Sequence, residues 1–146
     1  MTTLWTIGYE RALPDDLVAE LQAAGVQRVI DVRQRAQSRR PGMSKTRLSQ
    51  RLAADGIAYE HRRTLGTPPE IRPFYRRGAV REAGRRFREH AETHAADELD
   101  ALAAELEAGG PPTALLCLEA EASACHRRVV AELLQARLPG LLVVDL

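Results

Sequence analysis

The sequence lacks several features that define common classes of protein. It has only two cysteines among 146 residues, too few for a disulfide framework. It contains no run of the roughly 18 apolar residues that a membrane-spanning helix needs. Residues 1–5 lack the basic and apolar segments of a secretory leader. We therefore expect a soluble, cytoplasmic protein with reduced thiols and no membrane partner.

Common nucleotide-binding and hydrolase signatures are absent as well. The chain has no P-loop, no G-x-G-x-x-G fingerprint and no G-x-S-x-G nucleophile elbow. Aromatic residues make up 4% of the chain, which leaves few platforms for stacking single-stranded nucleic acid. We expect no cofactor, and these absences leave open whether the chain is an enzyme.

What the sequence does contain is a regular alternation of short apolar runs and amphipathic segments. The apolar, β-prone runs predict strands at residues 4–7, 29–32, 57–59, 113–118 and 141–144. Helices are predicted from Pro14 to Gly25, from a cap at Ser44 to Gly56, over 76–90, over 93–108, and after a cap at Ser123.

This alternation predicts one α/β domain over residues 1–146. We expect a Rossmann-like, three-layer arrangement, with a mainly parallel sheet of about five strands and helices on both faces. Continuous apolar strands fit this arrangement, because such strands are buried on both sides. The strand order does not follow from the sequence, but if the first strand lies beside the fourth, a ligand site is expected outside their carboxyl ends.

Polar residues follow three of the predicted strands and indicate where that site lies. Gly8, Tyr9 and Glu10 follow the first strand, Arg33 follows the second, and Glu119 follows the fourth. Because the carboxyl ends of parallel strands meet at one edge of a sheet, we expect these residues to lie close together.

The start of the last predicted helix points to the same edge. If Ser123 caps this helix, then Cys125, His126 and Arg127 occupy its first turn. A cation there opposes the helix dipole by about 0.3–1 kcal/mol, so stability alone does not favour it. Free backbone N–H groups beside arginines form an anion site. The alternative is a purely structural cluster of ion pairs with nearby glutamates.

Several residue types at this edge could perform chemistry. Glu10 or Glu119 could act as an acid or base, or orient an arginine. Cys125 could be a nucleophile with His126 as its base, although a buried, inert thiol is the commoner case. Cys117 and these neighbours are also metal-ligand types, but their spacing matches no common zinc motif, so we predict no metal.

The middle of the chain is strongly basic. Residues 33–88 hold 16 Lys or Arg and 4 Asp or Glu, and Lys45 is the only lysine of the whole chain. Such an arginine-rich stretch could meet phosphate-rich partners. The alternative is that basic segments simply pair with acidic ones inside the fold. Ser38 and Arg39 lie in the loop after Arg33, which is long enough to cover a site.

Six short motifs occur in an order that resembles the bacterial domain of unknown function 488 family. They span nearly the whole chain and are Thr6-Ile7-Gly8-Tyr9-Glu10, Ile30-Asp31-Val32-Arg33, Ser38-Arg39, Gly56-Ile57-Ala58-Tyr59, Leu65-Gly66-Thr67-Pro68, and Leu116-Cys117-Leu118-Glu119 with Cys125-His126-Arg127. The resemblance implies a small cytoplasmic α/β protein and supplies no reaction. The chain departs from the family pattern near Ala36, where a proline is often found.

Three functions remain open on these grounds. The leading hypothesis is an enzyme or sensor for a nucleotide-like, phosphorylated small molecule, whose anion would be bound by Gly8, Tyr9, Arg33, Ser38, Arg39 and Arg127. The second is a nucleic-acid-binding accessory protein that uses the basic 33–88 region. The third is a protein-interaction module with a vestigial pocket. The sequence does not indicate the oligomeric state of the protein.

Overall fold

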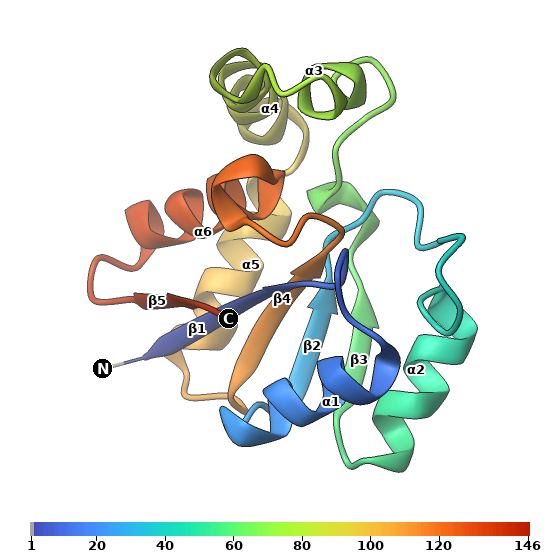
Figure 1. The fold of residues 1–146 in the computed structure, drawn as a ribbon. Coiled ribbons are helices and arrows are strands. Elements are labelled where there is room, and N and C mark those ends of the chain that lie inside the picture. Colours follow the sequence, from blue (N-terminus) through green and yellow to red (C-terminus); the bar gives the residue numbers. More distant parts are fainter. Residues whose placement is uncertain (1) are drawn as a thin grey trace.

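The computed structural model describes residues 2–146, and its five strands form one parallel sheet. The order across the sheet is β3-β2-β4-β1-β5 (Figure 1). The strands are β1 (Thr3–Gly8), β2 (Arg28–Asp31), β3 (Ala58–His61), β4 (Thr113–Cys117) and β5 (Leu142–Asp145). The predicted fold class is confirmed, and the first strand pairs with the fourth.

Helices cover both faces of this sheet (Figure 1). On one face lie α1 (Pro14–Ala23) and α2 (Lys45–Ala54); on the other lie α5 (Ala96–Glu107) and α6 (His126–Arg137), and α4 (Val80–His94) packs against these last two helices. Within residues 2–146, no helix is both long enough and apolar enough to cross a lipid bilayer.

The central strands β2 and β4 carry neighbouring apolar residues because these residues contribute to two separate cores. In β2, Ile30 packs toward α4, α5 and α6, whereas Val29 packs toward α1 and α2. In β4, Leu115 belongs to the same core as Ile30, and Leu116 belongs to the same core as Val29. Alternate side chains of a strand point to opposite faces, so a strand covered on both sides carries consecutive apolar residues.

The helices between β3 and β4 differ from the prediction. One helix was predicted over 76–90, but the chain forms a 3-10 turn, η1 (Arg63–Leu65), and a short helix, α3 (Arg72–Arg76), before α4. Pro73 lies in the first turn of α3, where proline is tolerated. Gly78, with φ of 79°, then separates α3 from α4.

The predicted cap of the last helix is also wrong. Ser123 lies within a 3-10 turn, η2 (Ala122–Ala124), and Cys125 is the residue that caps α6. Cys125 has an extended backbone, and its N–H donates to the carbonyl of Ala122. As a result α6 begins at His126, and Arg127 points back toward the sheet instead of toward a free helix end.

The topology leaves a crevice at the carboxyl edge of the sheet. β1 and β4 are neighbours, but the chain leaves β1 toward α1 on one face and leaves β4 toward α6 on the other. Connections that diverge in this way open a space between adjacent strand ends, which is where α/β proteins bind ligands.

Candidate functional site

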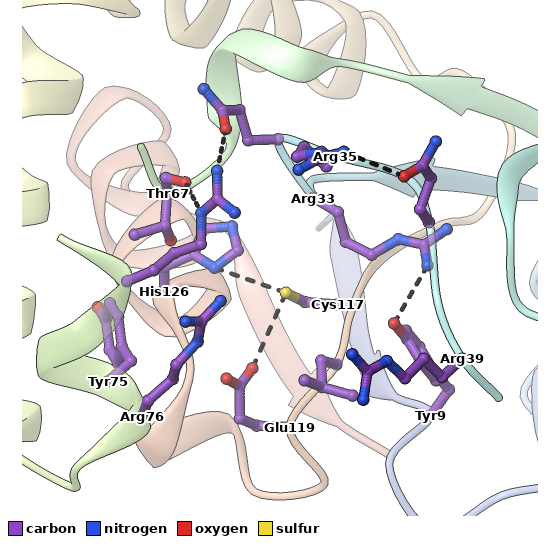
Figure 2. Close-up of a pocket in the computed structure, with 14 residues that line it drawn as sticks. Tyr9, Arg33, Arg35, Arg39, Thr67, Tyr75, Arg76, Cys117, Glu119 and His126 are labelled. Atoms are coloured by element: carbon purple, nitrogen blue, oxygen red, sulfur yellow. Dashed lines mark hydrogen bonds between the residues drawn. The ribbon is translucent and has the colours of Figure 1, made fainter. Parts of the chain in front are cut away.

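A cavity of about 540 Å³ lies at this carboxyl edge (Figure 2). Its walls come from the segments after β1, β2 and β4, from the first turn of α6, and from α3 together with the segment just before it. The lining residues are Tyr9, Arg33, Gln34, Arg35, Gln37, Arg39, Thr67, Arg72, Tyr75, Arg76, Cys117, Leu118, Glu119 and His126.

A buried ion pair anchors one side of the cavity. Asp31 is fully buried at the end of β2, and its carboxylate accepts hydrogen bonds from Nε and Nη2 of Arg33, the latter at 2.7 Å. Burial disfavours the charged form of Arg33, but Asp31 outweighs it and raises the pKa of Arg33. Arg33 also donates to the hydroxyl of Tyr9 at 3.1 Å (Figure 2), and Tyr59 donates to Asp31. Arg33 is therefore held rigidly, with most of its donors already used.

The other four arginines of the cavity have no such counter-ion. No salt bridge within residues 2–146 involves Arg35, Arg39, Arg72 or Arg76. Figure 2 labels three of them, Arg35, Arg39 and Arg76, around the opening of the cavity. Glu119 is the one carboxylate among the 14 lining residues. The cavity thus carries a large excess of positive charge.

Burial and the neighbouring arginines both act against the charged form of Arg72. Burial, Arg76 and Arg35 together lower the pKa of Arg72. Its guanidinium donates to neutral acceptors only, the carbonyl of Thr67 and the side-chain amide oxygen of Gln34. Bonds to neutral groups orient Arg72 without neutralising it, so an incoming anion would relieve the repulsion.

Two hydroxyl groups of the lining have no hydrogen-bond partner. These are Oγ1 of Thr67 and the phenol of Tyr75, both shielded from solvent. Burial, followed by the neighbouring Cys125, raises the pKa of Tyr75, so its hydroxyl remains a donor at neutral pH. Buried polar groups are nearly always satisfied in native proteins, so these two hydroxyls call for a partner such as water, an ion or a ligand.

Sulfur and imidazole side chains meet at the floor of the cavity. Sγ of Cys117, at the end of β4, lies 3.5 Å from Nδ1 of His126, and Sγ of Cys125 lies 3.8 Å from the same nitrogen. Oε2 of Glu119 lies 3.9 Å from Cys117 (Figure 2). Cys117 was considered from sequence only as a metal-ligand type, but it is the cysteine that lines the cavity.

The position of Cys125 favours the buried, inert thiol over the nucleophile, the two roles considered from sequence. It does not line the cavity and is 2% exposed. Burial, followed by the neighbouring Cys117, raises the pKa of the Cys125 thiol well above its ordinary value, so the thiol stays protonated. A low thiol pKa and access to substrate are both needed for a nucleophile, and Cys125 has neither.

Arg127 has a structural role and is not positioned to bind an anion. It is completely buried, and its guanidinium donates to the carbonyls of Glu119 and Ala120 at 2.5 and 3.3 Å and to Thr6 at 3.2 Å. This position does not support the prediction that Arg127 binds a ligand. The residue instead holds the connection between β4 and α6, which carries Glu119 into the cavity.

Gly8 and Glu10 support the same connection. A Cβ atom on Gly8 would lie 1.7 Å from the carbonyl oxygen of Glu119. Only glycine therefore allows the end of β1 to lie this close to the backbone of the connection between β4 and α6. The exposed carboxylate of Glu10 accepts a hydrogen bond from the N–H of Ala120 at 3.0 Å. Neither residue lines the cavity, and the predicted ligand contact of Gly8 and acid or base role of Glu10 are not supported by their positions.

The loop after β2 contributes Arg39 but not Ser38. Ser38 shapes this loop: its N–H donates to Oγ of Ser44, and its own Oγ accepts from the N–H of Arg40. Arg40 in turn donates to the carbonyl of Ala12. Ser38 therefore orients the loop and does not line the cavity, whereas Arg39 does.

The sequence located the site but not all of its residues. Of the residues named from sequence for ligand binding or catalysis, the structure brings five to the cavity: Tyr9, Arg33, Arg39, Glu119 and His126. The residues of α3 were missed, since nothing local distinguishes Arg72, Tyr75 and Arg76 from other basic helices. Thr67 was named from sequence only within the motif Leu65-Gly66-Thr67-Pro68, without a binding role. The structure shows that a Cβ on the preceding Gly66 would overlap the backbone of Gln34.

The fold and this cavity define a parallel α/β protein with an arginine-rich pocket at the strand ends. The chain belongs to the family described as domain of unknown function DUF488, whose family model matches residues 14–134. The resemblance seen in the six sequence motifs is thereby confirmed. Comparison with curated proteins and with solved structures gave no match.

Proposed function

We propose that this protein binds a small phosphorylated molecule, nucleotide-like in size, in the cavity at the carboxyl ends of β1, β2 and β4. The main support is the group of four arginines, Arg35, Arg39, Arg72 and Arg76, that surround the cavity without a carboxylate partner among residues 2–146. Arginine is the side chain best suited to phosphate, because its planar fork donates two parallel hydrogen bonds.

The size and lining of the cavity fit the rest of such a ligand. A volume of about 540 Å³ lies within the usual range for small-molecule sites. Tyr75 and Leu118 supply apolar surface, and the hydroxyls of Thr67 and Tyr75 supply hydrogen-bonding groups that lack partners. Glu119 is the one carboxylate of the lining, so an acid–base step on the ligand would run through it.

Replacing Arg76 with glutamine is expected to weaken binding of the phosphorylated ligand by roughly 10- to 150-fold. This factor corresponds to the loss of one hydrogen bond from a charged group, about 1.5–3 kcal/mol. Arg76 is exposed, so its replacement should leave the fold intact. Binding would be measured by calorimetry, after a thermal-shift screen of nucleotides, sugar phosphates and pyrophosphate has identified the ligand.

The matched control is Arg77→Gln, which makes the same change in charge one residue away. Arg77 lies over the ring of Phe74, at 4.3 Å from its centroid, and does not line the cavity. The Arg77→Gln variant should bind the ligand with the same affinity as the wild-type protein. Equal weakening by both substitutions would mean that binding reflects overall charge only, and failure of every compound in the screen would overturn the proposal.

A second candidate is the nucleic-acid-binding function, favoured by one further observation. An open, concave surface adjoins the cavity and shares Arg35 and Arg72 with it; it adds Lys45, Arg47 and Arg63, and no acidic residue lines it. Much of the remaining basic segment is neutralised within the fold. For example, Arg62 contacts Glu60, Glu98 and Glu105.

The double substitution Lys45→Gln and Arg47→Gln distinguishes the two candidates. If this surface binds duplex nucleic acid, the slope of log affinity against log salt should become shallower by about 0.9 for each lost phosphate contact. Fluorescence anisotropy with a labelled oligonucleotide at several salt concentrations measures this slope. An unchanged slope, with small-anion binding intact, would exclude this surface as a nucleic-acid site.

A further inference from the structure

The floor of the cavity contains a cluster that the sequence spacing did not reveal. Cys117 comes from the end of β4, whereas Cys125 and His126 come from the start of α6. The fold brings Sγ of each cysteine and a ring nitrogen of His126 to within 4.8 Å of one another. All three residues are buried, with exposed fractions of 5% or less.

The distances match those between ligands of one tetrahedral metal ion. Zn–S bonds of about 2.3 Å and Zn–N bonds of about 2.0–2.1 Å place sulfur and nitrogen ligands about 3.5 Å apart. The observed separations from Nδ1 of His126 are 3.5 Å to Cys117 and 3.8 Å to Cys125. Both nitrogen–sulfur separations are thus close to the value for ligands of one ion, and the two sulfur atoms lie within 4.8 Å of each other.

The imidazole is oriented as a metal ligand requires. Nε2 of His126 lies 2.8 Å from the carbonyl oxygen of Val32. A carbonyl only accepts hydrogen bonds, so Nε2 carries the proton and the lone pair of Nδ1 points toward the two sulfurs. A hydrogen bond from the second ring nitrogen to a backbone carbonyl is the usual support of a metal-bound histidine. The ring of Phe87 packs edge-on against His126, with centroids 5.1 Å apart, and fixes its tilt.

We infer that Cys117, Cys125 and His126 bind one divalent transition-metal ion, and that Zn²⁺ is the ion that fits this ligand set best. Thiolates and imidazole favour Zn²⁺ over the hard ions Mg²⁺ and Ca²⁺. Binding forms two Zn–S bonds and one Zn–N bond and releases the two thiol protons to solvent, with no change in oxidation state. The two thiolates balance the charge of the ion inside the buried site.

The fourth position of the ion faces the cavity. Cys117 and His126 both line the cavity, and Glu119 approaches Cys117 from that side (Figure 2). Three protein ligands with an open position are the pattern of catalytic rather than structural zinc. Glu119, water or an anion from the cavity would complete the coordination. The role of an anion as fourth ligand rests on the proposed function. The metal site itself rests only on the arrangement of Cys117, Cys125 and His126.

The test is titration of the reduced, chelator-treated protein with Co²⁺ and then with Zn²⁺. We expect one equivalent of Co²⁺ to bind, with the intense thiolate-to-cobalt absorption and the visible bands of a tetrahedral site, and Zn²⁺ to displace it. Cys117→Ser and Cys125→Ser should each strongly reduce the charge-transfer absorption. Because the wild-type spectrum alone identifies sulfur ligands, the test remains decisive even if a variant fails to fold.

His90→Gln is the matched control for adventitious binding. His90 and His94 lie one turn apart on α4, with ring centroids 4.8 Å apart, and form another place where a metal could bind. This variant should keep the full cobalt spectrum. A wild-type spectrum without thiolate absorption, or stoichiometric binding that disappears in His90→Gln, would overturn the inference.

A second arm separates the metal site from the anion pocket. Adding pyrophosphate to the cobalt-loaded protein should shift the visible bands if the anion reaches the fourth position. Arg72→Gln should lose this shift and still keep the cobalt spectrum. Cobalt binding without any pyrophosphate effect would remove the anion as fourth ligand and leave the metal site in place.

Discussion

Asp31→Asn is expected to lower the free energy of unfolding by about 3–5 kcal/mol, the usual cost of removing one partner from a buried ion pair. Asparagine keeps the shape of Asp31 but not its charge, so the buried guanidinium of Arg33 would lose its counter-ion. The hydroxyl of Tyr59 would lose its charged acceptor as well. Urea unfolding, followed by far-ultraviolet circular dichroism, measures the change.

The same chemical substitution at the surface provides the control. Asp15 pairs with Arg51, but the Asp15 side chain is 85% exposed. Asp15→Asn should therefore change the free energy of unfolding by about 1 kcal/mol or less. If Asp31→Asn were equally mild, the buried pair would not be what fixes Arg33 at the edge of the cavity.

Arg127→Ala is expected to destabilise the protein by a similar amount, about 3–5 kcal/mol, and also to weaken ligand binding at least tenfold. The substitution leaves a cavity and removes the donors to the carbonyls of Glu119 and Ala120. The connection that positions Glu119 would then lose its main internal support. Thermal unfolding and calorimetric titration on the same preparation measure both effects.

Arg128→Ala is the matched control, because Arg128 is the next residue but pairs with Asp145 on the surface. It should change stability and binding little. The two roles considered for Arg127 give different outcomes. A variant of unchanged stability that nevertheless fails to bind ligand would show that Arg127 contacts the ligand directly, contrary to its buried position.

The sequence predicted the architecture well because the relevant signals are local. Apolar runs, Pro14 at a helix start, and Gly25 and Gly56 after helix ends each act within a few residues. The edge of the sheet that carries the site followed from the same reasoning, since polar residues after β1, β2 and β4 must meet there.

The individual roles of the site residues were harder to predict, because they depend on contacts across long stretches of chain. Arg127 and Arg76 are both arginines in short basic stretches, yet one is completely buried beside Thr6 and the other is exposed at the cavity. Cys117 and Cys125 match no zinc motif in sequence because a strand end and a helix start supply them separately. Only the fold brings such residues together.

The position of β4 also has a consequence for the order in which the chain can fold. β4 lies between β1 and β2, and β1 pairs otherwise only with β5. During synthesis, β1 therefore has no partner in the sheet until residue 113 has left the ribosome, while β2 and β3 can pair much sooner. The protein must insert a late strand between two early segments, a non-local step of the kind that slows folding. The same step completes the floor of the cavity, so a binding-competent site is among the last features to form.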